Sequence, residues 1–343
     1  MLNLGSSLSN TAWVSTQPYT VNMAATYILS EESSQHIFTT EIVPQELSSV
    51  LHLHHKSDGK QPLAVLIVGQ TGAGKTRLAP VLLDAMTSLD RTPAHFIADT
   101  YKAYHPSYAQ ILDTKPALAS AATGTDARRW LTMACEFAAQ HRLDVLVESA
   151  CRHPDDFCSL AALFREAGYR VAVAVLAVPE ALSRLGILVR FHMNLPEAQS
   201  GRLPLRLTPK KVHDDSYAGM VEAARFVDES DAADEVVVVR RGNGVAYENT
   251  RGEGGKWERE AGAVRALEGE RRRPLSKEES EAVEEGLARL GKVSGDGLEE
   301  LIMEIRQLVD AMAAGPSMGK EESEGFPKLV PLDAVNFVGR GLS

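Results

Sequence analysis

The chain has 343 residues, of which 44% are hydrophobic and 24% are charged, a composition typical of a soluble globular protein with one large domain or two ordinary ones. Its net charge of −10 argues against a general nucleic-acid binder, because phosphate binding needs a clustered positive surface. The three cysteines show no CxxC spacing, which argues against a zinc site or a disulfide framework. No apolar run reaches transmembrane length and the first residues contain no Lys or Arg, so we expect a cytoplasmic protein without a membrane segment.

The first part of the chain predicts a tail followed by helices. Residues 1–27 have no clear pattern and are interpreted as a tail. Ser30 precedes two acids and a helical spacing of apolar residues, so we expect it to be the N-cap of a helix. Pro44 should end this helix, because proline lacks the N–H group that a helix interior needs. A second helix is expected over residues 45–55.

Apolar runs and helical patterns then alternate along the chain. Such alternation indicates a parallel sheet with helices on both faces, the α/β architecture of P-loop nucleotide-binding proteins. The segment around residues 106–123 is mixed and is expected to be partly helical. The expected strands are 63–68, 94–98, 144–148, 170–178 and 234–239, and the expected helices are 75–86, 125–141, 154–168 and 180–193.

The composition changes near residue 250. The segment after it is dense in charge and contains no run typical of a strand. Ser276 and Glu279 have the spacing of a capping box, and residues 297–315 form an amphipathic helical pattern. We therefore expect an α/β domain over residues 28–250 and a C-terminal helical region over residues 251–343.

One segment matches a phosphate-binding loop, G-x-x-x-x-G-K-[ST]. Glycines let backbone N–H groups point at phosphate oxygens, the lysine neutralises the β- and γ-phosphates, and the threonine hydroxyl binds Mg²⁺. The match lies between an expected strand and an expected helix, and chance would produce it on the order of 0.01 times in such a chain. The sequence thus predicts that ATP or GTP binds with Mg²⁺ over Gly69, Gln70, Thr71, Gly72, Ala73, Gly74, Lys75 and Thr76.

The rest of the sequence favours a small-molecule kinase over other P-loop proteins. It contains no D-x-x-G or N-K-x-D loop of a GTPase, and Glu148 is a weak match to the acidic pair of a motor ATPase. A kinase needs a base near the acceptor hydroxyl. Asp99 follows the second expected strand, at the sheet edge that faces the ligand crevice. We interpret it as a general base or a holder of Mg²⁺ through water, and a helix N-cap is the alternative.

Five segments, in the same order, resemble motifs of the zeta-toxin family of P-loop kinases. They lie between residues 63 and 250, and five ordered motifs are far more specific than a phosphate loop alone. The segments are GQTGAGKT (69–76), DTYKAYHPSY (99–108), VLVESACR (145–152), AVLAVPEALSRLGILVRF (174–191) and RLTPKKVHDDSY (206–217).

The resemblance implies an activity, a partner and catalytic residues. It implies transfer of the γ-phosphate of ATP or GTP to the 3′-hydroxyl of UDP-N-acetylglucosamine, with Mg²⁺. Bacterial members poison cell-wall synthesis and are held inactive by an antitoxin protein, so a toxin–antitoxin role is implied as well. Carried over by motif, Asp99 resembles the catalytic base and Lys75 the phosphate-binding lysine. Arg190 and Arg206 resemble the arginines that clamp the nucleotide phosphates.

The acceptor-binding motifs are only partly retained. By resemblance, Glu148 would form the floor of the acceptor site and Arg152 would reach the acceptor's diphosphate. The family's threonine that contacts the sugar nucleotide is Ala150 here. The family also has an acidic residue in the helix before the VLVESACR segment. This residue has no clear equivalent here, although Asp126 or Glu136 could substitute for it.

Two other hypotheses therefore stay open. The chain could be a kinase for another sugar, a nucleoside or an antibiotic-like alcohol, because the phosphate-handling motifs are kept and the sugar-handling ones are altered. It could also be a nucleotide-dependent switch that signals through its C-terminal helices.

Overall fold

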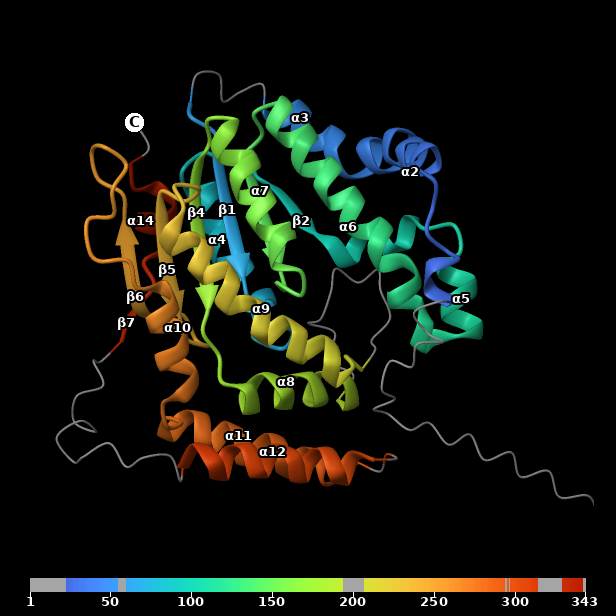
Figure 1. Cartoon of the computed structure of the whole chain (residues 1–343), viewed down its shortest axis with the longest axis vertical. Coiled ribbons are helices and arrows are strands. Elements are labelled where there is room, and N and C mark those ends of the chain that lie inside the picture. The colour runs from blue at the N-terminus through green and yellow to red at the C-terminus, as the bar shows by residue number, and fades with distance from the viewer. Residues whose placement is uncertain are drawn as a thin grey trace, which may run out of the picture.

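The computed structural model describes residues 23–54, 60–193, 207–293, 295, 297–313 and 329–341. Within these residues the chain forms a seven-stranded sheet in the order β2-β3-β1-β4-β5-β6-β7, with helices on both faces (Figure 1). The first five strands in this order are parallel, and β6 and β7 are antiparallel at one edge. The predicted fold class is confirmed. The strands are β1 (Leu63–Val68), β2 (Ala94–Ile97), β3 (Val145–Ser149), β4 (Arg170–Leu176), β5 (Glu235–Val239), β6 (Gly244–Thr250) and β7 (Val330–Pro331).

The central strand β1 is buried on both sides. Leu66 packs into the core on one face of the sheet, whereas Val65 and Ile67 pack into the core on the other face. Every residue of β1 is buried. Burial on both faces explains why the strand reads as a continuous apolar run and not as an alternating pattern.

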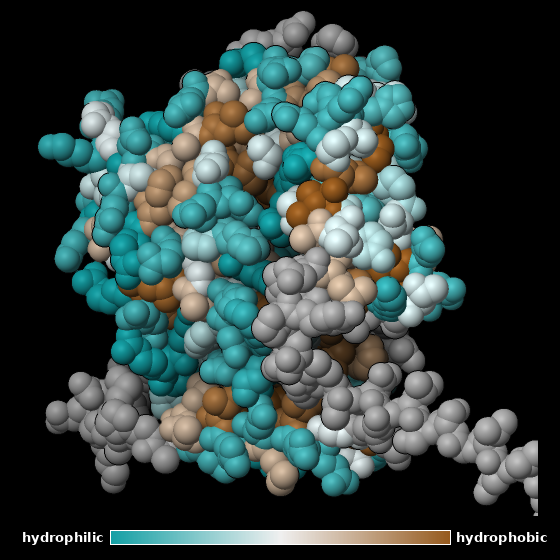
Figure 2. Space-filling model, turned by 45° about the vertical axis from the view of Figure 1, so that its right-hand side comes forward, coloured by the Kyte–Doolittle hydropathy of each residue, from teal (hydrophilic) through white to brown (hydrophobic). Residues whose placement is uncertain are grey.

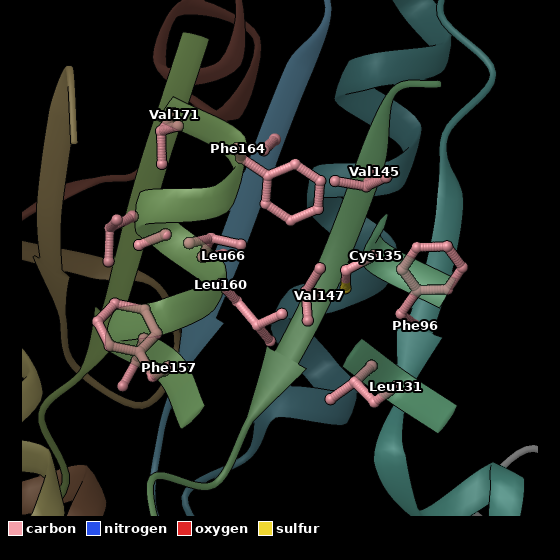
Figure 3. Close-up of a cluster of buried hydrophobic side chains, with 14 of the residues drawn as sticks. Leu66, Phe96, Leu131, Cys135, Val145, Val147, Phe157, Leu160, Phe164 and Val171 are labelled. Carbon is pink, nitrogen blue, oxygen red and sulfur yellow. The ribbon is translucent and has the colours of Figure 1, made fainter. Parts of the chain in front are cut away.

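One face of the sheet carries the larger core. Figure 3 shows Phe157, Leu160 and Phe164 directed toward the strands, with Leu131 in a neighbouring part of the same core. The helical spacing of these side chains places them on one side of each helix. The helix that was predicted over residues 125–141 begins earlier in the structure, at residue 116. The helices on this face are α6 (Pro116–Gln140), α7 (Pro154–Glu166), α9 (Lys210–Glu229) and α10 (Ala263–Arg272).

The other core continues past the end of the sheet. Leu82 and Phe337 cover the sheet itself, and Leu185, Leu287 and Leu301 extend the same cluster toward the C-terminal helices. Figure 1 shows α8 below the carboxyl ends of β1 and β4, with α11 and α12 beyond α8. The helices of this side are α4 (Lys75–Ser88), α8 (Glu180–His192), α11 (Lys277–Leu290), α12 (Leu298–Ala313) and α14 (Ala334–Gly339).

The N-terminal helices begin as predicted but pass through the expected break. The hydroxyl of Ser30 accepts a hydrogen bond from Ser33 N at 3.2 Å, which makes it the N-cap of α2. Pro44 does not end the helix, because the chain continues there as a π-helix in which Ser48 N bonds to Val43 O. The wider turn uses i→i+5 hydrogen bonds, so the missing N–H of proline is accommodated. These helices are α2 (Glu31–Ile37), η1 (Phe38–Leu47) and α3 (Ser48–His54).

The two ends of the chain also add elements that the sequence did not predict. Of the predicted tail, residues 1–22 lie outside the described residues, and Ala24 packs against Ile111 and Leu118. The C-terminal region is helical as expected, and it also supplies β7 and α14. The division at residues 27 and 250 stays a prediction. Two further short elements of the described residues are η2 (Ala98–Tyr104) and α5 (Tyr108–Thr114).

The surface is mostly polar on the face that Figure 2 shows, where hydrophobic residues form small separate groups. In the described part of the chain, no helix has both the length and the hydropathy to cross a membrane.

Candidate active site

A cavity of about 900 Å³ runs along the carboxyl ends of the parallel strands. Asp99, after β2, lines one side of it, and Lys75, after β1, lines the middle. Arg190 of α8 and Arg241, which follows β5, line the other side. Ligands of open α/β sheets bind at this edge, where the strand order reverses on either side of β1. The expected kinase residues that the structure describes therefore lie around one cavity.

The phosphate loop depends on two glycines with a left-handed backbone. Gly72 has a φ of 81° and Gly74 a φ of 106°, values that favour glycine. At Gly72 a Cβ atom would also lie 2.1 Å from the backbone oxygen of Ser183, so α8 packs directly on the loop. The buried side chain of Gln70 donates to Val178 O at 2.7 Å and anchors the loop to the end of β4.

Helix α9 supports the same loop from behind. The hydroxyl of Ser216 accepts a hydrogen bond from Thr71 N at 3.3 Å and donates one to Ala150 O. His213 is buried, and its Nε2 lies 2.8 Å from Ser183 Oγ on α8. Burial lowers the pKa of His213, so the neutral ring is favoured. The motif around residues 206–217 therefore includes residues that position the phosphate loop.

Lys75 lies at the electrostatic centre of the cavity. Its Nζ donates to Gly69 O at 2.6 Å. Burial lowers the pKa of Lys75, the negative charges of Glu148 and Asp99 oppose that effect, and the positive charge of Arg190 adds to it. All four of these side chains line the same cavity. A triphosphate placed there would meet two cations and two carboxylates.

Asp99 has a neighbour that sequence reasoning missed. Asp99 lies in the first turn of η2, and Lys102 donates a hydrogen bond to its carboxylate from one turn further on. Lys102 also donates to Ser120 Oγ of α6 at 2.9 Å. The carboxylate of Asp99 is 36% exposed, whereas the lysine side chain is 6% exposed. The signal was present in the sequence, because Lys102 is the basic position of the DTYK segment.

Glu148 lies at the end of β3, beside the strand that precedes the phosphate loop. Its partner in the β1–β3 register is Ile67, and its carboxylate lies 2.9 Å from His95 Nε2. Thr76 is exposed at the start of α4 and lines the same cavity. A hydroxyl and a carboxylate are oxygen donors of the kind that Mg²⁺ prefers. Thr76 and Glu148 therefore fit the metal that accompanies a nucleoside triphosphate.

Two arginines line the cavity on the side of Asp99. Arg152 Nε lies 3.8 Å from Asp215, and Arg128 Nε lies 3.2 Å from Asp156. Burial lowers the pKa of Arg128, Asp156 opposes that effect, and the charge of Arg152 adds to it. Asp156 has a larger effect on the pKa of Arg128 than Arg152 has, and a carboxylate lies beside each guanidinium group. Both arginines line the cavity, where guanidinium groups suit an anionic ligand.

The acidic residue that was expected in α6, the helix before β3, does not reach the cavity. Asp126 is buried against His105, with its carboxylate 3.5 Å from the ring, and Glu136 is exposed to solvent. The face of α6 that lines the cavity presents Arg128 and Leu131, which are three residues apart. The suggestion that Asp126 or Glu136 could substitute was therefore wrong. Arg206, the second expected clamp arginine, lies outside the described residues.

Arg241 is another cation of the cavity that sequence reasoning missed. It donates to Gly72 O at 2.6 Å and to Leu182 O at 3.1 Å, so it joins the phosphate loop to α8. Burial lowers the pKa of Arg241 to about 10, and the nearby charge of Arg77 adds to this effect. Arg241 belongs to the turn between β5 and β6, and that hairpin was not expected. The Asn243–Gly244 pair is a hairpin signal that could have revealed it.

A mostly parallel sheet with this loop at the end of its central strand defines a P-loop protein. Residues 49–252 match the family model described as zeta toxin, and the chain belongs to this family. It is 25% identical over 198 residues to toxin PezT of Streptococcus pneumoniae serotype 4, across 57% of this chain and 74% of that one. It is 24% identical over 158 residues to toxin zeta of Streptococcus pyogenes, across 45% of this chain and 52% of that one.

A solved structure from the PezAT chromosomal toxin–antitoxin system of Streptococcus pneumoniae is similar, with a TM-score of 0.58. The sequence identity to it is 20%, and the likeness covers 78% of this chain and 97% of that chain. At this identity the structural likeness establishes the fold.

Proposed function

We propose that this protein is a kinase that transfers the γ-phosphate of ATP or GTP, bound with Mg²⁺, to a hydroxyl group of a small acceptor. UDP-N-acetylglucosamine, phosphorylated at its 3′-hydroxyl, is the proposed acceptor. One observation carries the proposal: Asp99 and Lys75 line the same cavity, and their charges interact across it. A base beside a phosphate-binding lysine is the arrangement that phosphoryl transfer to a hydroxyl needs.

The residues of the phosphate loop and of the cavity have separate roles in this scheme. Backbone N–H groups of the phosphate loop and the ammonium group of Lys75 hold the β- and γ-phosphates. Asp99 accepts the proton of the acceptor hydroxyl as the oxygen attacks phosphorus, and the β-phosphate oxygen leaves on the opposite side. Arg190 stabilises the charge that the transferred group carries in the transition state. Arg206 is proposed for the same task by family resemblance.

Thr76 and Glu148 would hold Mg²⁺, and their oxygen donors fit that ion. When bound, the metal neutralises charge on the β- and γ-phosphate oxygens. The remaining contribution of the chain is positioning, because a loose phosphoryl transfer needs little covalent help from the protein.

The acceptor site supports a second candidate. Ala150 lines the cavity where the resemblance implies a threonine that contacts the sugar nucleotide, and neither Asp126 nor Glu136 is among the residues that line it. Both changes remove a contact to the sugar. They favour a different acceptor, such as another sugar, a nucleoside or an antibiotic-like alcohol.

The relatives' names extend the proposal to a biological role. Two relatives are named toxins, and the similar solved structure comes from a toxin–antitoxin system. We infer that this chain acts as a toxin and that an antitoxin protein restrains it. Growth arrest when the unmodified chain is expressed, and normal growth when the Asp99→Ala variant is expressed instead, would support that role.

An acceptor panel tests the function directly. The purified full chain is incubated with Mg²⁺ and γ-labelled ATP or GTP, together with UDP-N-acetylglucosamine, other nucleotide sugars, nucleosides and simple sugars. We expect label on UDP-N-acetylglucosamine. Label on another acceptor alone would select the second candidate. Binding of nucleotide without transfer to any acceptor would contradict a kinase and favour a nucleotide-dependent switch.

A further inference from the structure

The cavity extends past the family-matched part of the chain. The family match ends at residue 252, yet four residues of α11 line the same cavity as the phosphate loop. Figure 1 shows α11 beyond α8, on the side of the carboxyl ends of the strands. The α11 residues that line the cavity are Ala282, Glu285, Gly286 and Arg289.

The strand order assigns the two ends of the cavity to the two substrates. Asp99 follows β2, at the edge of the sheet, and the phosphate loop follows β1, in the middle. In an in-line transfer the attacking and leaving oxygens lie on opposite sides of phosphorus. With the acceptor beside Asp99, the leaving diphosphate and its nucleoside extend toward β4 and β5. The elements at that end are α8, Arg241 and α11.

Helix α11 is firmly attached at this end. A Cβ atom at Gly286 would lie 3.1 Å from Leu185 of α8, so the two helices are in close contact. A capping box between Ser276 and Glu279 begins the helix, and Arg273 makes two hydrogen bonds to Glu279, both of 2.6 Å. The wall that α11 adds to the cavity is therefore held in place by packing and by ion pairs.

The charges of the wall suit the nucleoside end of a nucleotide. Arg289 is 52% exposed, and its guanidinium lies 3.8 Å from the carboxylate of Glu285. Two cations adjoin the phosphate loop itself, because Arg241 donates to Gly72 O at 2.6 Å and Arg77 follows Thr76 in the chain, and both line the cavity. The phosphates of a nucleotide would suit these cations. The charged pair on α11 offers hydrogen-bonding groups of the kind that a ribose and a base need.

We propose that α11 forms the nucleoside-binding wall of the donor site, with Ala282 facing the nucleoside and Arg289 binding its polar groups or its α-phosphate. This inference rests on the proposed kinase function and adds a donor-binding element from the C-terminal helical region. Binding of the nucleotide would then depend on residues 277–290, which the phosphate loop alone does not require.

A pair of tryptophan variants tests the wall. Ala282 and Ala288 are both exposed on α11, but only Ala282 lines the cavity. Binding of Mg·ATP, Mg·GTP and inorganic tripolyphosphate to the full chain is measured by calorimetry. For Ala282→Trp we expect the affinity for both nucleotides to fall by about tenfold or more, while tripolyphosphate binding changes by less than about twofold. Ala288→Trp should bind all three like the unmodified chain.

A pair of arginine variants tests the charge. Arg289 and Arg306 are 52% and 51% exposed, and each lies within 4 Å of a glutamate, but Arg306 is on α12, outside the cavity lining. We expect Arg289→Ala to weaken Mg·ATP binding by about threefold to tenfold, and Arg306→Ala to leave it unchanged.

The outcomes separate this inference from the proposed function. Nucleotide binding that is unaffected in Ala282→Trp, or lost together with tripolyphosphate binding, would overturn the assignment of α11 to the nucleoside. Equal effects of Arg289→Ala and Arg306→Ala would overturn the role of Arg289. If the unmodified chain bound neither nucleotide, the proposed function itself would fail, and the inference with it.

Discussion

Lys102 donates a hydrogen bond to the carboxylate of Asp99, the residue proposed as the catalytic base. The two residues are one turn apart on η2, and the lysine is fixed further by Ser120 of α6. The lysine side chain is almost fully buried, so its position is set by packing as well as by charge. Lys102 therefore holds the carboxylate in a defined direction at the acceptor side of the cavity.

We expect Lys102→Met to lower the turnover of the kinase by about tenfold to a hundredfold, because a misplaced base reduces the fraction of productive complexes. Mg·ATP affinity should stay within about twofold, since the described hydrogen bonds of Lys102 go to Asp99 and Ser120 on the acceptor side. Steady-state kinetics and calorimetry measure the two quantities. Lys115→Met is the matched control, because Lys115 is exposed outside the cavity. A loss of nucleotide affinity equal to the loss of turnover would contradict the positioning role.

Replacing the base itself should separate chemistry from binding. Asp99→Ala removes the proton acceptor, so we expect turnover to fall by at least about a hundredfold while nucleotide affinity remains near that of the unmodified chain. Single-turnover transfer of labelled phosphate to the acceptor measures this. Asp113→Ala, on the exposed side of α5, is the control. Undiminished turnover of Asp99→Ala with its best acceptor would show that Asp99 is not the base.

Alanine substitutions at Gly72 and Gly269 should change the free energy of unfolding in opposite directions. Gly72→Ala would force a Cβ to within 2.1 Å of Ser183 O at a positive φ, so we expect a loss of about 2 kcal/mol or more in the free energy of unfolding, and weaker nucleotide binding. Gly269 lies in α10, exposed and with open space around it, so Gly269→Ala should add about 0.5–1 kcal/mol. Urea unfolding measures both. Equal effects of the two variants would contradict the close contact at Gly72.

Features that depend on a few adjacent residues could be predicted from the sequence. The phosphate loop, the apolar strands and the cap at Ser30 each depend on a few adjacent residues, and the structure has them where the sequence placed them. Asp99 and Lys75 could be expected in one cavity because the carboxyl ends of parallel strands meet at one edge. Periodicity and strand polarity were sufficient for these conclusions.

Features that depend on tertiary contacts were missed. Pro44 was expected to end a helix, but its neighbours adopt π-helical turns. Arg128 could not be distinguished from Asp126 as the α6 residue that reaches the cavity, because that depends on the rotation of the helix about its axis. The contribution of α11 follows from packing between segments that are far apart in sequence. Charge patterns alone could not place Arg289 in the lining of the same cavity as the phosphate loop.

Arg128 should determine the affinity for the acceptor. Arg128 and Arg152 both line the cavity, and guanidinium groups bind anions well, so we expect an anionic group of the acceptor to bind Arg128. We predict that Arg128→Ala raises the KM for the acceptor by about tenfold and leaves Mg·ATP affinity unchanged. Arg225→Ala, on an exposed part of α9, serves as the control. An unchanged acceptor KM in Arg128→Ala would show that no anionic group binds there.

The ion pairs before α11 predict a pH dependence of stability. Glu270 accepts hydrogen bonds from Arg240 at 2.8 Å and from Arg273 at 2.7 Å. Burial acts to raise the pKa of Glu270, but the hydrogen bonds from these arginines outweigh it, so the pKa lies below its ordinary value of 4.5. A carboxyl whose pKa is lower in the folded state stabilises the fold above its unfolded pKa, and loses that contribution as the pH falls through its folded pKa.

We therefore expect Glu270→Gln to lower the free energy of unfolding by about 2 kcal/mol at pH 7. The difference from the unmodified chain should be constant from pH 7 to about pH 5 and should shrink below pH 4.5, because Glu270 of the unmodified chain then becomes protonated and its stabilising charge is lost. Urea unfolding of both proteins at pH 7, 5 and 3.5 measures it, and the comparison between them cancels the titration of other groups. A difference that stayed constant or grew toward low pH would contradict the assignment of the ionised carboxylate to this ion-pair cluster.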